Sequence, residues 1–162
     1  MKHRTHLKVR FGDVDLAGIV YFPRFLHYCH VGMEEYFSVV MGIDYDKLLL
    51  ERRIAFPTVH IEIDFLHPLR YGEEVEIEME IKKIGRTSVE WNYRIFRHGE
   101  SDVIAQSRQI TVCTDLDSFE KKRVPEWLRS RLIPSPDRSG TGATSEAKRL
   151  ETAVEPANRF NR

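Results

Sequence analysis

The sequence predicts an α+β fold in which one long helix lies against an antiparallel sheet. Three observations predict it: one long apolar stripe with helical spacing, several segments that alternate apolar and polar residues, and short turns between those segments. The chain has 162 residues, of which 41% are hydrophobic. This size fits a single globular domain whose core needs neither a metal nor a disulfide.

The first strand is predicted near the N-terminus, where Leu7, Val9 and Phe11 alternate with basic residues. A helix of roughly 28 Å follows, because Pro23 suits its first turn and Gly42 suits its C-terminal cap. An apolar stripe recurs between them at three- and four-residue steps: Phe25, Leu26, Cys29, Met33, Tyr36, Phe37 and Val40.

A glycine in the middle of this helix, Gly32, predicts close approach by a packed neighbour, since glycine costs about 1 kcal/mol there relative to alanine. A shorter helix is expected to open near Asp44, and another near Pro125. Between these two helices lie four strand patterns, at residues 59–65, 75–81, 89–95 and 103–114. The first three have one apolar and one polar face, and the fourth is predicted to be more uniformly buried. The connections at 85–87 and 98–101 are too short for parallel crossovers, so the sheet is predicted to be antiparallel.

Composition and charge exclude several classes of protein. The 25 Lys and Arg residues balance 25 Asp and Glu residues, so we expect no basic face for nucleic acid. No apolar run reaches the ~18 residues of a membrane span, and the N-terminus has no signal-peptide pattern. We therefore expect a soluble cytoplasmic protein that binds neither nucleic acid nor membrane, with Cys29 and Cys113 as reduced thiols.

Residues 1–133 form the predicted domain, and residues 134–162 form a predicted disordered tail. The tail is rich in Ser, Thr, Gly, Pro and charged residues, which bury too little apolar surface to offset the entropy of ordering. The alternative for residues 143–153 is a short helix that forms on a partner. Unpaired edge strands in the domain's sheet predict a homo-oligomer, a dimer or a dimer of dimers.

The segment richest in candidate chemistry is residues 11–23, which read FGDVDLAGIVYFP. It places Asp13 and Asp15 between the end of a strand and the start of the long helix. The first N–H groups of a helix lack intrahelical acceptors and can stabilise an acyl-transfer oxyanion, while a nearby carboxylate attacks the carbonyl or activates water. The structural alternative is that these aspartates cap the helix or form an Asx turn.

Residues 11–28, FGDVDLAGIVYFPRFLHY, resemble the signature of the 4-hydroxybenzoyl-CoA thioesterase family, with the acid spacing, Gly18 and Pro23 in register. Residues 68–78 (PLRYGEEVEIE) and 82–95 (KKIGRTSVEWNYRI) resemble the second and third strands of that family. The resemblance implies the hotdog fold, in which a curled antiparallel sheet wraps one long helix. It also implies an enzyme that hydrolyses an acyl-CoA thioester.

The resemblance assigns the catalytic carboxylate to Asp15, as nucleophile or general base, and the oxyanion-binding amide to Phe22. Asp13 is then a supporting residue or a turn residue. Phe22 stands where a neighbouring branch of short-chain acyl-CoA thioesterases carries a histidine, which favours the hydroxybenzoyl-type branch.

Gly18, Tyr21 and Pro23 fall at substrate-binding positions of the family, and the aromatic side chains here suit an aryl or other apolar acyl group. Arg86 matches part of the basic cluster that binds coenzyme A phosphates. The alternatives are core packing for the aromatic residues and a solvated turn for Arg86.

The sequence predicts neither a cofactor nor a metal, because His27, Cys29 and His30 lack a further ligand that would complete a site. The predicted activity is hydrolysis of an aromatic or short- to medium-chain acyl-CoA. The alternative is a non-catalytic module that binds acyl-CoA or an acyl-carrier protein on the same fold.

Overall fold

The computed structural model describes residues 2–132, and the predicted tail lies outside these residues. The elements, in chain order, are β1 (Lys2–Lys8), a 3-10 turn (Phe11–Asp13), α1 (Pro23–Glu35), a π-helical turn (Tyr36–Val40), α2 (Tyr45–Leu50), β2 (Ile54–Ala55), β3 (Thr58–Phe65), β4 (Glu74–Ile84), β5 (Ser88–Arg97), β6 (Val103–Val112), β7 (Thr114–Asp115) and α3 (Glu126–Arg129). None of the described helices is long and apolar enough to cross a bilayer.

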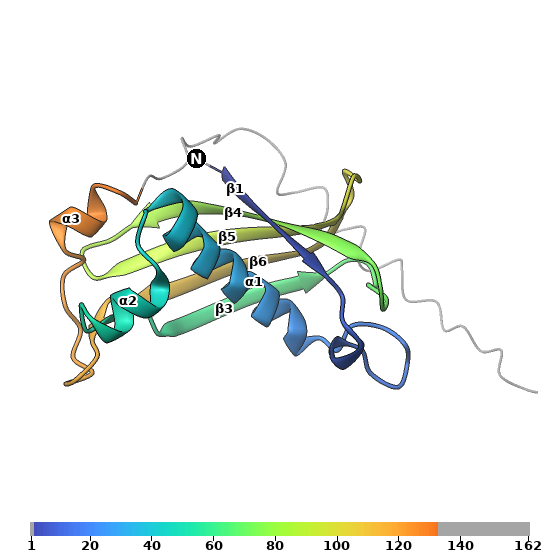
Figure 1. Ribbon diagram of the computed structural model, residues 1–162, viewed down its shortest axis with the longest axis horizontal. Helices are drawn as coiled ribbons and strands as arrows, with labels where there is room; N and C mark the ends of the chain where they lie inside the picture. Colours follow the sequence, from blue (N-terminus) through green and yellow to red (C-terminus); the bar gives the residue numbers. More distant parts are fainter. Residues whose placement is uncertain (1, 133–162) are drawn as a thin grey trace, which may run out of the picture.

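Five strands form one antiparallel sheet in the order β1-β4-β5-β6-β3, and α1 lies along one of its faces (Figure 1). This confirms the predicted α+β class and the hotdog arrangement. β2 and β7 pair separately as a short antiparallel ladder that the periodicity did not predict. Consequently the segment predicted as one strand over 103–114 ends at Val112, and Thr114 belongs to the second ladder.

The core lies between α1 and the inner face of the sheet. The stripe on α1 and the alternating residues of β4 and β5 meet there, including Phe25, Cys29, Met33, Ile77 and Trp91, all at most 4% exposed. The close approach predicted at mid-helix is confirmed, because a Cβ on Gly32 would stand 3.2 Å from Cγ2 of Ile77.

Helix boundaries follow the predicted signals. Pro23 is the first helical residue, Gly42 adopts a positive φ of 64°, and Asp44 precedes α2. The last turn of the long helix widens, with the Met41 N–H donating to the Tyr36 carbonyl at 3.2 Å. The prediction for Phe11 is wrong, because β1 ends at Lys8 and Phe11 is 80% exposed in a 3-10 turn.

Two predicted strand faces differ from expectation. The apolar face of β3 is largely exposed in the single chain, with Val59 60% and Phe65 44% accessible, because α1 packs mainly against β4 and β1, at the other side of the sheet. Conversely, Glu76 and Glu78 on the predicted solvent-exposed face of β4 are buried. β4 lies between β1 and β5, and long basic side chains from both strands cover this face.

Glu78 is held by three cations on the outer face of the sheet. Its carboxylate accepts from Lys2 Nζ at 2.8 Å, from Arg4 Nη2 at 3.1 Å and from Arg94 Nε at 3.1 Å. Burial by itself would raise the pKa of Glu78, but these bonds outweigh it and lower the pKa from 4.5 to about 2.

Acid should therefore destabilise the protein through Glu78. A carboxyl group with a depressed folded-state pKa stabilises the fold fully above its unfolded pKa and loses that contribution as pH falls through the folded value. We expect the free energy of unfolding to fall between pH 4.5 and about 2. Glu78→Gln should be less stable than wild type at neutral pH and should show a shallower acid dependence.

Urea denaturation at several pH values measures this effect. Glu74→Gln, at an exposed position of the same strand, is the control and should follow the wild-type profile. Parallel profiles for wild type and Glu78→Gln would contradict the assignment.

Candidate active site

The loop between β1 and α1 is a small hairpin. Val14 pairs with Val20, the Asp15 N–H donates to the Ile19 carbonyl at 2.9 Å, and the Gly18 N–H donates to the Asp15 carbonyl at 3.0 Å. Gly18 has a φ of +75°, a conformation that favours glycine. The glycine therefore lets the chain reverse directly after Asp15 and return toward the helix.

Asp15 lies at the exposed tip of this hairpin. Its Oδ1 accepts the Ala17 N–H at 2.8 Å, which is an Asx turn. This bond orients the carboxylate and leaves Oδ2 without a hydrogen bond from any of residues 2–132. The turn and a chemical role are compatible, because each uses a different oxygen.

The N-terminus of α1 presents one free backbone donor. Phe22 is the N-cap residue, Pro23 has no N–H, and the Arg24 N–H donates to the Tyr21 carbonyl at 2.8 Å. No residue of the described part of the chain accepts from the Phe22 N–H. The positive end of the helix dipole thus coincides with an unpaired amide that can bind a developing oxyanion.

Asp13 has a structural position. It is 8% exposed, and its Oδ2 accepts the Arg10 N–H at 2.8 Å. Arg24 Nε lies 3.6 Å from Oδ1, and the Asp13 carbonyl accepts the Tyr21 N–H at 2.8 Å. Burial, together with the neighbouring Asp13 carboxylate, raises the pKa of Tyr28. Asp13 therefore ties the end of β1 to the first turn of α1.

Aromatic side chains surround the start of α1. Tyr21 is 50% exposed and Phe22 is 59% exposed. Phe65, at the end of β3, lies 6.3 Å from Phe22 and 5.2 Å from Phe25 between ring centroids. These rings form an open apolar surface beside the Phe22 amide, and an aryl group can pack there.

Arg86 lies at the opposite end of the sheet from this loop. It is exposed in the β4–β5 turn, whereas β1 delivers the loop beside Glu74, where β4 begins (Figure 1). β4 has 11 residues. Its ends are therefore roughly 33 Å apart at about 3.3 Å per residue. Within one chain, therefore, Arg86 and Asp15 lie at opposite ends of the sheet.

The two cysteines are free and buried. Burial raises the pKa of the Cys29 thiol to about 12 and that of the Cys113 thiol to about 11. Neither thiol is ionised to a thiolate at neutral pH, so neither cysteine is a candidate nucleophile. The candidate nucleophilic group is therefore the Asp15 carboxylate.

Three contributors to this site were absent from the sequence prediction. Arg24, in the first turn of α1, forms an ion pair with Asp13, and Tyr28, in the second turn, lies close enough that, besides burial, the Asp13 carboxylate raises its pKa. Because these two residues are four positions apart, they share one face of α1, and this face meets the preceding loop. Phe65 had no such signal, because only the tertiary fold brings the end of β3 to α1.

Comparison with known proteins agrees with this fold and loop. Residues 9–132 match a family model described as the thioesterase-like superfamily, a range that includes the whole hairpin and Arg86. A 1,4-dihydroxy-2-naphthoyl-CoA hydrolase of Gloeothece citriformis is 36% identical over 122 residues, which cover 74% of this chain and 84% of that protein. The hydrolase of the same name from Synechococcus elongatus is 31% identical over 125 residues, covering 76% and 90% respectively.

A solved structure agrees in fold. The 1,4-dihydroxy-2-naphthoyl-CoA thioesterase from Synechocystis superposes with a TM-score of 0.74 at 24% identity, covering 82% of this chain and 96% of that one. At this identity the likeness concerns the fold alone.

Proposed function

The chain belongs to the thioesterase-like superfamily, and from that premise we propose that it hydrolyses an aromatic acyl-CoA thioester to a free acid and coenzyme A. The observation that carries the proposal is the unpaired Phe22 amide at the start of α1, on the same short loop as the Asp15 carboxylate. The named relatives, which act on 1,4-dihydroxy-2-naphthoyl-CoA, support an aromatic acyl group.

In the proposed mechanism the thioester carbonyl oxygen accepts the Phe22 N–H, which stabilises the negative charge of the tetrahedral intermediate. With Asp15 as general base, water attacks the carbonyl carbon while the carboxylate takes the proton. The C–S bond then breaks, and the coenzyme A sulfur leaves and receives a proton. With Asp15 as nucleophile, its oxygen attacks the carbonyl carbon, the C–S bond breaks and the coenzyme A sulfur leaves, and water then hydrolyses the resulting mixed anhydride to the free acid and the Asp15 carboxylate.

The exposed rings of Tyr21, Phe22 and Phe65 are the proposed contact for the acyl group. Offset or edge-to-face contacts with an aromatic substrate are worth about 0.5–1.5 kcal/mol each beyond the area that they bury. Gly18 contributes by letting the loop reverse, and Pro23 contributes by starting α1 directly after Phe22.

We propose a homodimer formed at β3. This strand is at an edge of the sheet, and its inner apolar side chains Val59, Ile61 and Phe65 are 60%, 41% and 44% exposed. An uncovered edge strand with an uncovered apolar face is unfavourable in water, and antiparallel pairing with the same strand of a second copy covers both.

Two-fold symmetry at this edge would bring Arg86 of the partner subunit to the site. The rotation that pairs β3 with its copy reverses the direction of the second sheet. Arg86 of the partner subunit then comes to the end of the assembly at which Asp15 and Phe22 lie. We propose that it binds the phosphates of coenzyme A there.

Subunit complementation tests this shared site. Asp15→Asn and Arg86→Ala should each impair activity alone, whereas a mixed dimer of the two contains one site with both native residues. Random mixing in equal amounts makes half the dimers mixed, so activity should rise to about a quarter of wild type. Asp15→Asn mixed with the double variant Asp15→Asn/Arg86→Ala is the control and should stay inactive. Failure of the first mixture to gain activity, in subunits shown to exchange, would overturn the shared site.

The activity is tested by measuring thiol release across 1,4-dihydroxy-2-naphthoyl-CoA, 4-hydroxybenzoyl-CoA, benzoyl-CoA, and short- and long-chain acyl-CoA. We expect the highest kcat/KM with one of the aromatic thioesters, and the comparison between fused and single rings identifies the acyl group. Tight binding of these thioesters without thiol release would contradict the proposal and favour the non-catalytic binding module.

A further inference from the structure

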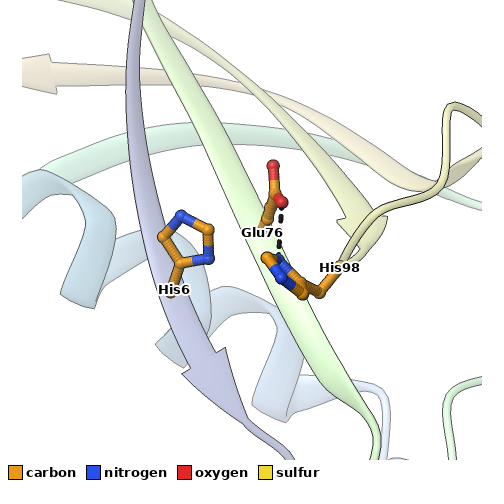
Figure 2. A group of neighbouring side chains, drawn as sticks. All are labelled: His6, Glu76 and His98. Atoms are coloured by element: carbon orange, nitrogen blue, oxygen red, sulfur yellow. Dashed lines mark hydrogen bonds and ion pairs between the residues drawn. The ribbon is translucent and has the colours of Figure 1, made fainter.

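Three side chains with metal-ligating atoms converge on the outer face of the sheet, away from α1. They are His6 of β1, Glu76 of β4 and His98 of the turn that follows β5 (Figure 2). Their ligand atoms all lie within 4.8 Å of one another. Among residues 2–132 this is the one group of three such side chains that the structure brings together.

The backbone holds the three residues in place. His6 stands directly opposite Glu76 in the β1–β4 register. The His98 N–H donates to the Glu74 carbonyl at 2.8 Å, which fixes the turn beside β4. The imidazole rings of His6 and His98 meet edge to face at 5.1 Å between centroids. The cluster is therefore set by strand pairing and by a backbone hydrogen bond.

The Glu76 carboxylate uses its two oxygens differently. Oε2 accepts from Arg4 Nη1 at 2.8 Å, and Oε1 lies 2.7 Å from His98 Nδ1. The Glu76 side chain is only 11% exposed, whereas that of His98 is 52% exposed. Arg4 thus orients one oxygen, and the other faces the histidines at a site that solvent reaches.

We propose that His6, Glu76 and His98 bind a Zn²⁺ ion. Two imidazole nitrogens and one carboxylate oxygen form a donor set that Zn²⁺ accepts, with water in the fourth position. Bonds of about 2.0–2.2 Å in a tetrahedral site separate neighbouring ligand atoms by roughly 3.3 Å. The present contacts bracket that value, so side-chain rotation within the cluster accommodates the ion.

Arg4 is a cation beside this site, and two carboxylates share its positive charge. In addition to Glu76, it donates to Glu78 at 3.1 Å. Arg4 would therefore act as an outer partner of a bound ion, because it donates to the ligating Glu76 carboxylate and fixes its orientation. A bound Zn²⁺ would join the edge strand β1 to β4 and to the β5–β6 turn. This inference is independent of the proposed thioesterase function.

Isothermal titration of the untagged chain with ZnCl₂ tests the site. We expect one ion per chain in wild type. His6→Ala and His98→Ala should each weaken binding by at least about tenfold, because losing even an outer partner of a metal ligand costs that much. The control is His60→Ala, since His60 is also an exposed histidine beside a glutamate, 2.9 Å from Glu62, with no second histidine in its group.

A second readout separates ligation from general destabilisation. Co²⁺ in place of Zn²⁺ should give the visible absorption of a tetrahedral site in wild type and His60→Ala, and lose it in the two ligand variants while far-UV circular dichroism stays unchanged. Binding weaker than about 0.1 mM in wild type would overturn the proposal. Equal affinities for wild type and the ligand variants would also overturn it.

Discussion

Asp15→Asn is expected to lower kcat by about 10²–10⁴-fold, the range that a positioned general base contributes. Asparagine keeps an Oδ1 that can accept the Ala17 N–H, so the hairpin retains its 2.8 Å turn contact and loses only the basic or nucleophilic oxygen. KM should change little, because the proposed substrate contacts lie elsewhere on the loop and on Phe65. Steady-state thiol release with the best aromatic thioester measures both constants.

The matched control is Asp102→Asn, which makes the same change at an exposed position in the β5–β6 turn and should leave kcat unchanged. A kcat for Asp15→Asn within about threefold of wild type would remove Asp15 from the chemistry. Single-turnover hydrolysis in ¹⁸O-labelled water distinguishes the two roles. With a nucleophilic Asp15, water attacks the Asp15 carbonyl of the mixed anhydride, so the label enters Asp15 and the product acid stays unlabelled, whereas a general base places the label in the product acid.

Trp91→Ala is expected to lower the free energy of unfolding by about 3–5 kcal/mol, the usual cost of truncating a buried aromatic residue. Trp91 is fully buried on β5, and its ring contacts Tyr36 and Phe37 from the last turn of the long helix. Its Nε1–H donates to Thr111 Oγ1 at 2.8 Å, so the variant also loses a buried hydrogen bond. Denaturant unfolding at one fixed protein concentration measures the change.

Trp127 provides the control within the same chain. It is 39% exposed on α3, where the Arg52 guanidinium lies 5.6 Å from its ring centroid. Trp127→Ala should cost no more than about 1 kcal/mol. Similar losses for the two tryptophan variants would contradict the placement of the core between the long helix and β5.

Local patterns were sufficient to predict most of the fold. Pro23 and Gly42 act through their own backbone preferences, and the helical stripe and the strand alternation each identify a face that avoids water. The mid-helix Gly32 was informative for the same reason, because a residue with no Cβ at a costly position implies a close neighbour. The two-residue strands β2 and β7 are too short to show any period.

The alternation of apolar and polar residues could not predict which element or subunit covers each face of the sheet. The apolar face of β3 is exposed in the single chain although it alternates as cleanly as that of β4. The glutamates of β4 are buried although their pattern is that of a wet face. Alternation reports how a side chain interacts with water, whereas burial depends on which strand or subunit lies beside it.

The features of the candidate site also fall into two groups, those that depend on local sequence and those that depend on packing between distant segments. The sequence by itself determined the acidic hairpin, its positive-φ glycine, and the unpaired amide before Pro23, because each depends on residues within one turn of the chain. Only the tertiary structure decided that Arg86 lies at the far end of the sheet and that His6, Glu76 and His98 meet on its outer face. Those relations depend on strand order and register, which arise from packing between segments far apart in the chain.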